Sequence, residues 1–278
     1  MSQPRLSVII VNFNTREWLA RCLHSLERQT IREELEIIIV DNASSDDSIQ
    51  MVRSEFPACI LLPQTENGGF GAANNIGARQ SAAPTLLFLN PDTEVEADDS
   101  LEEFLDVFEP DAVAAIGAGT LYDEGGELER STGTFPTVTS LVLDRLLASL
   151  PALRAPLGRH SARHWSGFDR RRQVDWVTAA AIWIRREAFA ALGGFDEEIF
   201  MYYEDVDLCY RARSAGEVCM YYPVGAITHF RNKAPTSKDR KQLQRNWLRH
   251  FGDKHYRAWH QSPTRLAFSG LCWISRAR

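Results

Sequence analysis

The 278-residue sequence predicts an α/β fold in which a mainly parallel sheet is flanked by helices and followed by a basic helical appendage. Two observations favour this fold. The first 110 or so residues alternate short, apolar, β-branched runs with segments of helical periodicity. No internal repeat or low-complexity linker interrupts the chain, which is long enough to bury one full core. Alternating strands and helices imply parallel strands joined by right-handed crossovers.

Four strands and three helices are expected in this first part. Each apolar run is short enough for a strand and ends in polar or turn-forming residues, and the segments between the runs have helical spacing. Serine and aspartate residues after the second run are able to cap the helix that follows. The expected strands are residues 6–14, 35–41, 59–64 and 85–90, and the expected helices are residues 16–30, 48–56 and 71–82.

The pattern changes after about residue 110. A glycine-rich segment favours strands and turns, and an arginine-rich stretch follows it. Residues 174–200 predict a strand, a short helix ended by two glycines, and a loop. Residues 203–216 predict a helix with three carboxylates in its first turn, and residues 218–230 predict a last pair of strands that carries His229.

The composition excludes several classes of protein. A hydrophobic content of 44% and a charged content of 24% are ordinary for a folded soluble protein. Five cysteines without CxxC spacing indicate reduced thiols rather than a disulfide framework or a zinc site. The N-terminal apolar run is too short for a signal peptide, and no run reaches the roughly 18 residues of a membrane span, so we expect a cytoplasmic location. The GxGxxG and GxxxxGK[ST] fingerprints are absent, which argues against a nicotinamide enzyme and a P-loop NTPase.

The net charge of −6 is unevenly distributed along the chain. Residues 229–278 carry a balance of +10, which leaves −16 for residues 1–228, and six arginines lie within residues 154–172. Such basic segments suit an anionic membrane surface, where each basic residue adds about 1 kcal/mol of attraction. They suit solvated faces equally well, so both interpretations stay open. Among partners, no nucleic acid is expected, and the oligomeric state is not predicted.

The ends of the predicted strands suggest where a functional site lies. The carboxyl ends of parallel strands meet along one edge of a sheet, where open α/β folds bind ligands. One apolar run stops abruptly at Asn90-Pro91-Asp92, although this tripeptide also suits a simple turn. We expect the strand-end groups to converge into one site. They are Asn12, Asn14, Asp41, Asn90, Asp92 and His229.

Three further patterns have both a functional and a structural interpretation. The glycines of ENGGFGAANNIG (residues 66–77) allow a ligand to approach the backbone, and the following helix N-terminus favours a diphosphate, but any sharp turn uses glycine. The carboxylates of YEDVD (residues 203–207) suit a general base or favourable helix electrostatics. His229, together with a carboxylate, suits Mn²⁺ or a similar divalent ion, although a lone histidine is more often structural.

Six segments occur in an order that is highly specific when they are taken together. They are SVIIVNFN, IIIVDNASSD, ENGGFGAANNIG, LFLNPDT, the run from Trp176 to Gly216, and AITHF. These segments resemble glycosyltransferase family 2, and specifically its bacterial rhamnosyltransferase-type branch. The resemblance implies a GT-A fold, which is a Rossmann-like, mainly parallel sheet flanked by helices. It also implies a catalytic domain of residues 1–230, with a nucleotide-binding half (1–110) and an acceptor half (111–230), before a basic helical appendage (231–278).

The resemblance implies a nucleotide-sugar donor, a divalent metal ion (Mn²⁺ or Mg²⁺) and inversion at the anomeric carbon of the sugar. In the family, the carboxylate of the second strand reads the pyrimidine, and the late histidine binds the metal or the diphosphate. The residues so assigned are Asn12, Asn14, Asp41, Asn67, Gly68, Asn74, Asn75 and Asn90 for the nucleotide sugar, Asp92 and His229 for the metal, Asp205 as catalytic base, and Trp176, Thr178, Glu204 and Asp207 for the acceptor or loop orientation.

Two positions depart from the family pattern. The first carboxylate of the family's DxD motif is the amide of Asn90, so Asp92 is the one remaining direct metal carboxylate. The family's small-residue stretch, often Ser-Gly-Ala, is Thr178-Ala179-Ala180, which leaves the details of the acceptor pocket undefined.

The expected activity is the transfer of a sugar to a glycan or polyprenyl-linked acceptor in cell-surface polysaccharide synthesis, at the inner face of the cell membrane. The first expected donor is dTDP-L-rhamnose, with UDP- and GDP-sugars as alternatives. The alternative function is a non-catalytic subunit that binds a nucleotide sugar, but such a subunit has no need of a base. A nucleotide-sugar synthase would need a glycine-rich triphosphate loop, which the first strand lacks.

Overall fold

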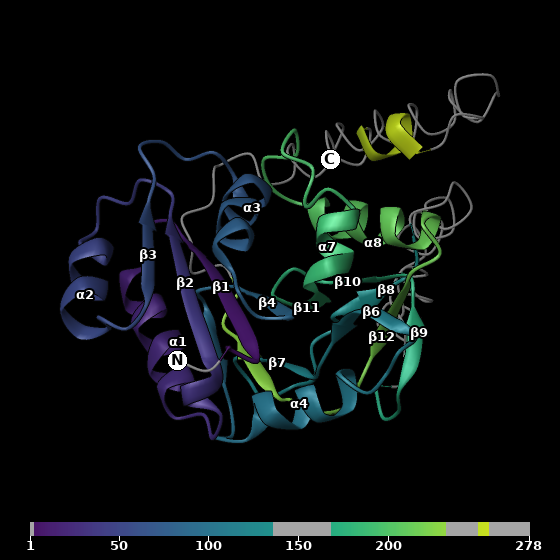
Figure 1. Cartoon of the computed structure of the whole chain (residues 1–278), viewed down its shortest axis with the longest axis horizontal. Helices are drawn as coiled ribbons and strands as arrows, with labels where there is room; N and C mark the ends of the chain where they lie inside the picture. Colours follow the sequence, from purple (N-terminus) through teal and green to yellow (C-terminus); the bar gives the residue numbers. More distant parts are fainter. Residues whose placement is uncertain (1–2, 136–167, 232–249, 256–278) are drawn as a thin grey trace, which may run out of the picture.

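A computed structural model describes residues 3–135, 168–231 and 250–255 (Figure 1). One eight-stranded sheet runs through the molecule and is joined by a two-stranded and a three-stranded sheet. In spatial order, the large sheet contains β3 (Ile60–Pro63), β2 (Leu35–Asp41), β1 (Leu6–Asn12), β4 (Thr85–Leu89), β11 (Ala181–Arg185), β6 (Ala114–Ala118), β12 (Val218–Tyr221) and β9 (Arg172–Val174). The prediction of an α/β fold with a mainly parallel sheet is confirmed.

The first four strands of this order, β3 to β4, pair in parallel, as expected for strands joined by helical crossovers. The direction changes at β11, which is antiparallel to both β4 and β6. Beyond it, β12 is parallel to β6, and β9 is antiparallel to β12. The second half of the chain therefore extends the sheet from the first half and reaches the end of β4.

Helices cover both faces of the sheet. They are α1 (Arg16–Glu27), α2 (Ser48–Glu55), α3 (Phe70–Gln80), α4 (Ser100–Phe108), α7 (Arg186–Ala191) and α8 (Glu204–Ser214), with a 3-10 turn at Arg32–Glu34. Side chains of α1, α2 and α4 pack on one face, and those of α3, α7 and α8 pack on the other (Figure 1). Along β1, Val8 and Ile10 face the first layer and Ile9 faces the second, which is the alternation expected of a strand buried on both sides.

The strands and helices predicted in the first half are all present, within a few residues of the predicted ends. Helix α4 was not predicted, although Leu101, Phe104, Leu105 and Phe108 recur at helical spacing and are fully buried. Phe104 stacks on the indole of Trp183 in β11, with 4.1 Å between the ring centroids. The missed helix therefore anchors the strand at which the sheet changes direction.

The predicted last pair of strands is wrong in its pairing. Both strands exist, but β12 belongs to the large sheet, whereas β13 (Ile227–His229) lies in the three-stranded sheet between β5 (Thr93–Val95) and β7 (Leu121–Asp123). A sequence pattern indicates strands but not their partners, and here the two strands diverge. The two-stranded sheet pairs β8 (Thr132–Gly133) with β10 (Trp176–Val177).

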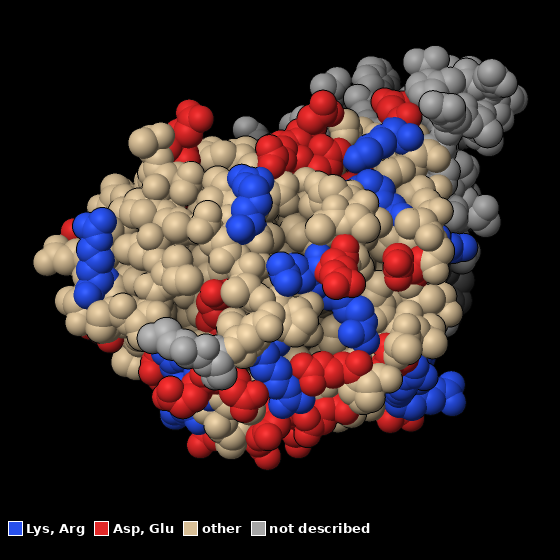
Figure 2. Space-filling model, in the orientation of Figure 1, with Lys and Arg blue, Asp and Glu red and all other residues tan. Residues whose placement is uncertain are grey.

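The charges on the face shown in Figure 2 are mixed. Acidic side chains gather along its lower edge, over α4, whose described acidic residues are Glu102, Glu103 and Asp106, and basic side chains are scattered between acidic ones. Of the two basic segments predicted from the sequence, residues 154–167, 232–249 and 256–278 lie outside the described residues. Within the described part of the chain, no helix combines the length and apolar character needed to cross a membrane.

Helix α3 packs closely against the sheet at Gly77. A Cβ atom there would lie 2.5 Å from Cγ2 of Ile9 and 3.3 Å from Cγ2 of Val40. Because cores tolerate little overpacking, we expect Gly77→Val to lower the free energy of unfolding by about 1–3 kcal/mol. Urea unfolding measures this change. As a control, Arg79→Val on the exposed side of the same helix should stay within about 0.5 kcal/mol of the wild type, and equal stability of the two variants would contradict the close approach.

Candidate active site

The carboxyl ends of β1 and β2 bring Asn12 and Asp41 together. The two residues are opposite each other in the parallel register, and both are buried. Nδ2 of Asn12 donates to Oδ2 of Asp41 at 2.7 Å, and the backbone N–H of Ser44 donates to Oδ1 at 2.8 Å. Oδ1 of Asn12 accepts a hydrogen bond from the hydroxyl of Thr15. The carboxylate of Asp41 is therefore fixed at the strand end by its neighbours.

Asn14 belongs to the same corner of the sheet. Its backbone has a positive φ of 52°, a conformation that asparagine tolerates better than most residues. Its N–H donates to the hydroxyl of Ser44, and its Oδ1 accepts from the N–H of Ser45. The loops after β1 and β2 are thus tied together by side-chain hydrogen bonds.

The glycine-rich loop before α3 lies against the segment that precedes α8. Gly69 has a φ of +92°, and a Cβ atom there would lie 2.6 Å from the carbonyl oxygen of Phe200. The N–H of Phe70 donates to that same oxygen at 2.9 Å. Oδ1 of Asn67 accepts from Gly69 N–H, and Nδ2 of Asn42 donates to the carbonyl of Gly69. Only glycine fits this contact, so the loop is constrained by the protein itself as well as suited to a ligand.

The two adjacent amides of α3 point in different directions. Asn74 donates to the carbonyl of Phe70 in its own helix, and its Oδ1 is buried without a hydrogen-bond partner. Asn75 exchanges two hydrogen bonds with the backbone of Phe195 and donates to Glu197. The amide of Asn75 therefore binds the segment before α8, whereas Asn74 has a buried acceptor whose hydrogen-bonding capacity is not used within the protein.

The end of β4 brings Asp92 next to His229. Thr93 in β5 pairs with His229 in β13, and the N–H of Phe230 donates to the carbonyl of Asp92 at 2.9 Å. As a result, Nε2 of His229 lies 3.5 Å from Oδ1 of Asp92. The carboxyl group of Asp92 is nearly buried, with 5% of the residue exposed. Two groups that are 137 positions apart in the chain thus meet as the strand-end hypothesis predicted.

A third member of this cluster, Glu129, was missed in the sequence. It is buried, its Oε2 lies 3.1 Å from Nδ1 of His229, and Arg231 forms an ion pair with its Oε1 at 2.5 Å. Burial alone would lower the pKa of His229, but its hydrogen bonds with Asp92 and Glu129 raise the pKa to about 9. Glu129 stands in a turn-rich stretch without a motif, so no local signal distinguishes it from a surface glutamate.

Asp92 and His229 fit a divalent metal ion as two of its ligands. Carboxylate oxygen and imidazole nitrogen are a donor set that Mn²⁺ accepts, and Glu129 orients the imidazole from its other nitrogen, as outer carboxylates do in metal sites. Among the described residues, no group of three or more histidine, cysteine, aspartate or glutamate side chains has the geometry of a metal site. The remaining ligands would have to come from a bound molecule and water.

Asp205 is linked to the end of β4 through the turn that precedes β11. Its Oδ2 accepts a hydrogen bond from the N–H of Ala179 at 3.0 Å, and the next residue, Ala180, accepts one from the N–H of Asn90 at 3.0 Å. Its Oδ1 accepts from the N–H of Val206. Burial raises the pKa of Asp205 above its ordinary value, although these backbone hydrogen bonds oppose the increase. A carboxylate of raised pKa at the same sheet edge as Asp92 is suited to accept a proton.

Glu204, the neighbour of Asp205, has no such support. It is buried, with 5% of the residue exposed, and its Oε2 has no hydrogen-bond partner. Burial, and next the negative charge of Asp205, raise the pKa of Glu204 to about 8. Two adjacent carboxyl groups whose pKa values are raised are a typical feature of a functional site.

The other residues expected around the acceptor form hydrogen bonds or ion pairs within the protein itself. The indole N–H of Trp176 donates to the carbonyl of Thr134, and the N–H of Thr178 donates to the carbonyl of Ser131. Asp207 is fully buried among cationic side chains, so it orients neighbouring segments and has no atom exposed to an acceptor.

Comparison with known proteins identifies a family. The family model described as glycosyl transferase family 2 matches residues 7–171. The match covers more than half of the chain and confirms the resemblance carried by the six segments.

Three relatives with similar sequences are named as sugar transferases. The chain is 27% identical over 288 aligned residues to the N-acetylglucosaminyl-diphospho-decaprenol L-rhamnosyltransferase of Mycobacterium tuberculosis, covering 95% of this chain and 89% of the relative. It is 26% identical to the rhamnosyltransferase WbbL of Escherichia coli K12 (80% and 82% covered) and 30% identical to the low-salt glycan biosynthesis hexosyltransferase Agl10 of Haloferax volcanii (75% and 61% covered).

Solved structures share the fold. A mannosyltransferase of Pyrobaculum calidifontis, in complex with GDP-Man and Mn²⁺, superposes with a TM-score of 0.57 at 18% identity, and S. aureus TarS superposes with a TM-score of 0.56 at 16% identity. Both alignments cover 89% of this chain but only 60% and 39% of the solved chains. At such low identity these structures confirm the GT-A type of fold and nothing finer.

The unsatisfied carboxyl group of Glu204 should make stability depend on pH. Because the pKa of this group is about 8 in the folded protein and ordinary in the unfolded chain, the folded state holds an extra proton between pH ~4.5 and ~8. The free energy of unfolding should therefore fall as pH rises through that window, by about 1 kcal/mol or more. In Glu204→Gln, the part of this decrease in the free energy of unfolding that comes from Glu204 should be absent. Urea unfolding of both proteins at pH 5.5 and 8.5 measures it, and parallel pH profiles would contradict the assignment.

Proposed function

Since this chain belongs to glycosyl transferase family 2, we propose that it transfers a sugar from a nucleotide-sugar donor to a hydroxyl group of a glycan or polyprenyl-linked acceptor, with inversion at the anomeric carbon. The observation that supports this most directly is the linkage from Asn90 through Ala180 and Ala179 to Asp205. It ties the proposed base to the strand end that carries Asp92. A donor bound at Asp92 would thus have its anomeric carbon within reach of a base held by the same sheet.

The nucleoside would bind where β1 and β2 end. Asn12, Asn14 and Asp41 lie at that corner, and hydrogen bonds from Asn12 and from the N–H of Ser44 fix the orientation of the Asp41 carboxylate before any ligand arrives. The backbone of the loop at Asn67 and Gly68, and the free acceptor of Asn74, would contact the sugar or diphosphate. Asn75 would contribute indirectly, by holding the segment before α8 against this loop.

Asp92 and His229 would hold the divalent metal ion, with Glu129 orienting the imidazole. When bound, such an ion neutralises the charge that develops on the leaving diphosphate. Asn90 would contact the donor beside it. In this arrangement, Glu129 and Arg231 fix the imidazole of His229 and limit its motion at the edge of the site.

Asp205 would act as the general base. Its carboxylate would take the proton from the acceptor hydroxyl as that oxygen attacks the anomeric carbon, and the bond to the diphosphate would break on the opposite side. The raised pKa of Asp205 brings its basicity closer to neutral pH, where a base is most effective. The backbone N–H groups of Ala179 and Val206 would hold the carboxylate in one orientation throughout. Trp176, Thr178 and Glu204 would border the acceptor.

The names of two relatives suggest the substrates. The Mycobacterium tuberculosis relative transfers L-rhamnose to a diphospho-decaprenol acceptor, as its name states, and the Escherichia coli relative is a rhamnosyltransferase. We therefore favour dTDP-L-rhamnose as donor and a polyprenyl diphosphate-linked glycan as acceptor in cell-surface polysaccharide synthesis. An acceptor of this kind lies in a membrane, so the protein would work at the inner face of the cell membrane, in peripheral contact with it.

The role of Asp205 predicts a separation of binding from turnover. Asp205→Asn keeps the size of the side chain and one of its two hydrogen bonds with backbone N–H groups, since only its amide oxygen accepts, and it removes the proton acceptor. We expect transfer from labelled dTDP-L-rhamnose to fall by about 10² or more, with donor affinity unchanged. Asp106→Asn, at an exposed carboxylate paired with Arg5, should retain full turnover. Near-normal turnover of Asp205→Asn would exclude this residue as the base.

The role of Asp92 predicts a loss of metal binding. Asp92→Asn should weaken the binding of Mn²⁺ in the presence of dTDP by about 10-fold or more, because a direct carboxylate ligand becomes a neutral amide. Electron paramagnetic resonance of free Mn²⁺ measures this without any need for turnover. The matched control is Glu94→Gln, two residues away and paired with Arg21. Equal Mn²⁺ affinity in the two variants would remove Asp92 from the metal site.

A further inference from the structure

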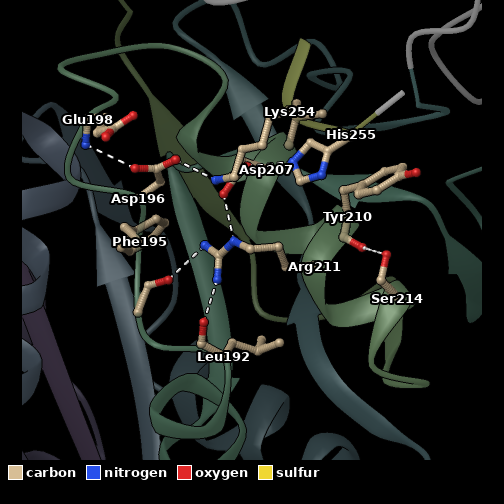
Figure 3. A network of polar contacts seen from close by, with 12 residues as sticks. Leu192, Phe195, Asp196, Glu198, Asp207, Tyr210, Arg211, Ser214, Lys254 and His255 are labelled. Atoms are coloured by element: carbon tan, nitrogen blue, oxygen red, sulfur yellow. Dashed lines mark hydrogen bonds and ion pairs between the residues drawn. The ribbon is translucent and has the colours of Figure 1, made fainter. Parts of the chain in front are cut away.

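A buried ionic network joins the first turn of α8 to the helical residues 250–255 (Figure 3). Its centre is Asp207, two residues after the proposed base, with no exposed side-chain surface. Nζ of Lys254 lies 2.8 Å from Oδ1 of Asp207, and Nε2 of His255 lies 2.7 Å from the same oxygen. Nε of Arg211 donates to Oδ2 at 2.7 Å. Both carboxylate oxygens are thus engaged by side chains of two separate segments.

The charged state of Asp207 depends on its neighbours. Burial alone would raise the pKa of Asp207, but hydrogen bonds from His255 and Lys254, together with the charge of Arg211, lower the pKa well below its usual range. A buried carboxylate without partners is strongly unfavourable, so loss of these contacts would be costly. The first turn of α8 cannot move without either breaking these contacts or moving residues 250–255 with it.

The same cations also hold the loop that precedes α8. Lys254 forms a second ion pair with Asp196, and Arg211 donates to the carbonyl oxygens of Leu192 and Gly194 at 2.7 Å each (Figure 3). The adjoining residue, Phe195, exchanges hydrogen bonds with Asn75 in α3. The loop is thereby fixed on one side by the donor-binding helix and on the other by Lys254.

Aromatic packing seats the C-terminal segment on α8. Phe251 is buried, with 1% of the residue exposed, and its ring meets Tyr210 edge-on at 5.3 Å between centroids. The ring of His255 lies 4.3 Å from that of Tyr210. The contact between residues 250–255 and α8 is therefore a packed interface that brings Lys254 and His255 to Asp207.

The ion pair between Arg213 and Asp175 differs from the Asp207 network in its exposure to solvent. Arg213 and Asp175 also join α8 to a distant segment, but 63% of the Arg213 side chain is exposed. Exposed pairs of this kind contribute little and do not restrain their surroundings. The Asp207 network instead is buried and ends on the two segments that flank Asp205, namely the loop before α8 and the first turn of the helix.

We propose that Lys254 and His255 are positioning residues for the active site, which act through Asp207 and Asp196 to hold Asp205 in its working orientation. The proposal rests on the proposed role of Asp205 as base. Residues 250–255, which follow the six segments that resemble the family, would then help to position the catalytic base. Binding of the nucleoside, which uses the ends of β1 and β2, should be independent of these residues.

The test uses the full chain with the double substitution Lys254→Met and His255→Gln. We expect hydrogen exchange across residues 195–207 to accelerate by about 10-fold or more, while exchange in β1 and β2 stays unchanged. We also expect kcat to fall by about 10-fold or more, since a small displacement of a reacting group is costly, with the KM for the donor within about threefold. Arg213→Met is the matched control and should change neither quantity.

Two further variants distinguish positioning from loss of folding. If the double variant does not fold, Lys254→Met alone leaves His255 and Arg211 on Asp207 and should show the same two effects in smaller degree. Lys254→Arg keeps the cation and should restore kcat to within about threefold of the wild type. Exchange and kcat within twofold of the wild type in the folded Lys254→Met or double variant would overturn the proposal. If the wild type itself transfers no sugar, the proposed function fails, but the exchange measurement still decides whether the C-terminal segment holds this loop.

Discussion

The antiparallel insertion of β11 between β4 and β6 is the constraint on which the site depends. Without it, the first half of the chain would be a parallel sheet with polar residues at its strand ends but no base near them. The pairing of Ala181 with Leu89 continues into the hydrogen bond from Asn90 to Ala180, and Ala179 then binds the carboxylate of Asp205. Stacking of Trp183 on Phe104 anchors the inserted strand from below. The geometry of the proposed chemistry is therefore a consequence of sheet pairing, and not of loops alone.

Most buried charges of the site are held by partners, which makes the arrangement rigid before any ligand binds. Asp41 has Asn12 and Ser44, Glu129 has His229 and Arg231, and Asp207 has Arg211, Lys254 and His255. Buried carboxylates are stable only with such support, and the support fixes their direction. Glu204 is the exception, since it is buried with an unpartnered oxygen and a raised pKa. A buried polar atom without a partner lowers the stability of the folded state, and such unfavourable groups are typical of functional sites.

The sequence predicts the first half of the fold well because its strands are short apolar runs bounded by turn residues, and strand–helix alternation allows few topologies. It also predicts that Asp92 and His229 meet, and that α8 begins with carboxylates. The partners of β13 could not be predicted, because a three-residue strand carries no information on register. Glu129 and Lys254 could not be found either, since only the folded chain brings them to His229 and Asp207. Helix α4, in contrast, had a readable apolar periodicity and was simply missed.

Calorimetric titration of the wild-type protein with dTDP, UDP and GDP, each with and without Mn²⁺, tests the central claim most directly. The account predicts that one of these nucleotides binds clearly more tightly than the others, and that its affinity rises when Mn²⁺ is present, because the proposed donor would contact the strand ends at both Asp41 and Asp92. That nucleotide would also identify the class of donor. The absence of binding by all three, with and without the metal ion, would contradict the claim that these strand ends bind a nucleotide sugar.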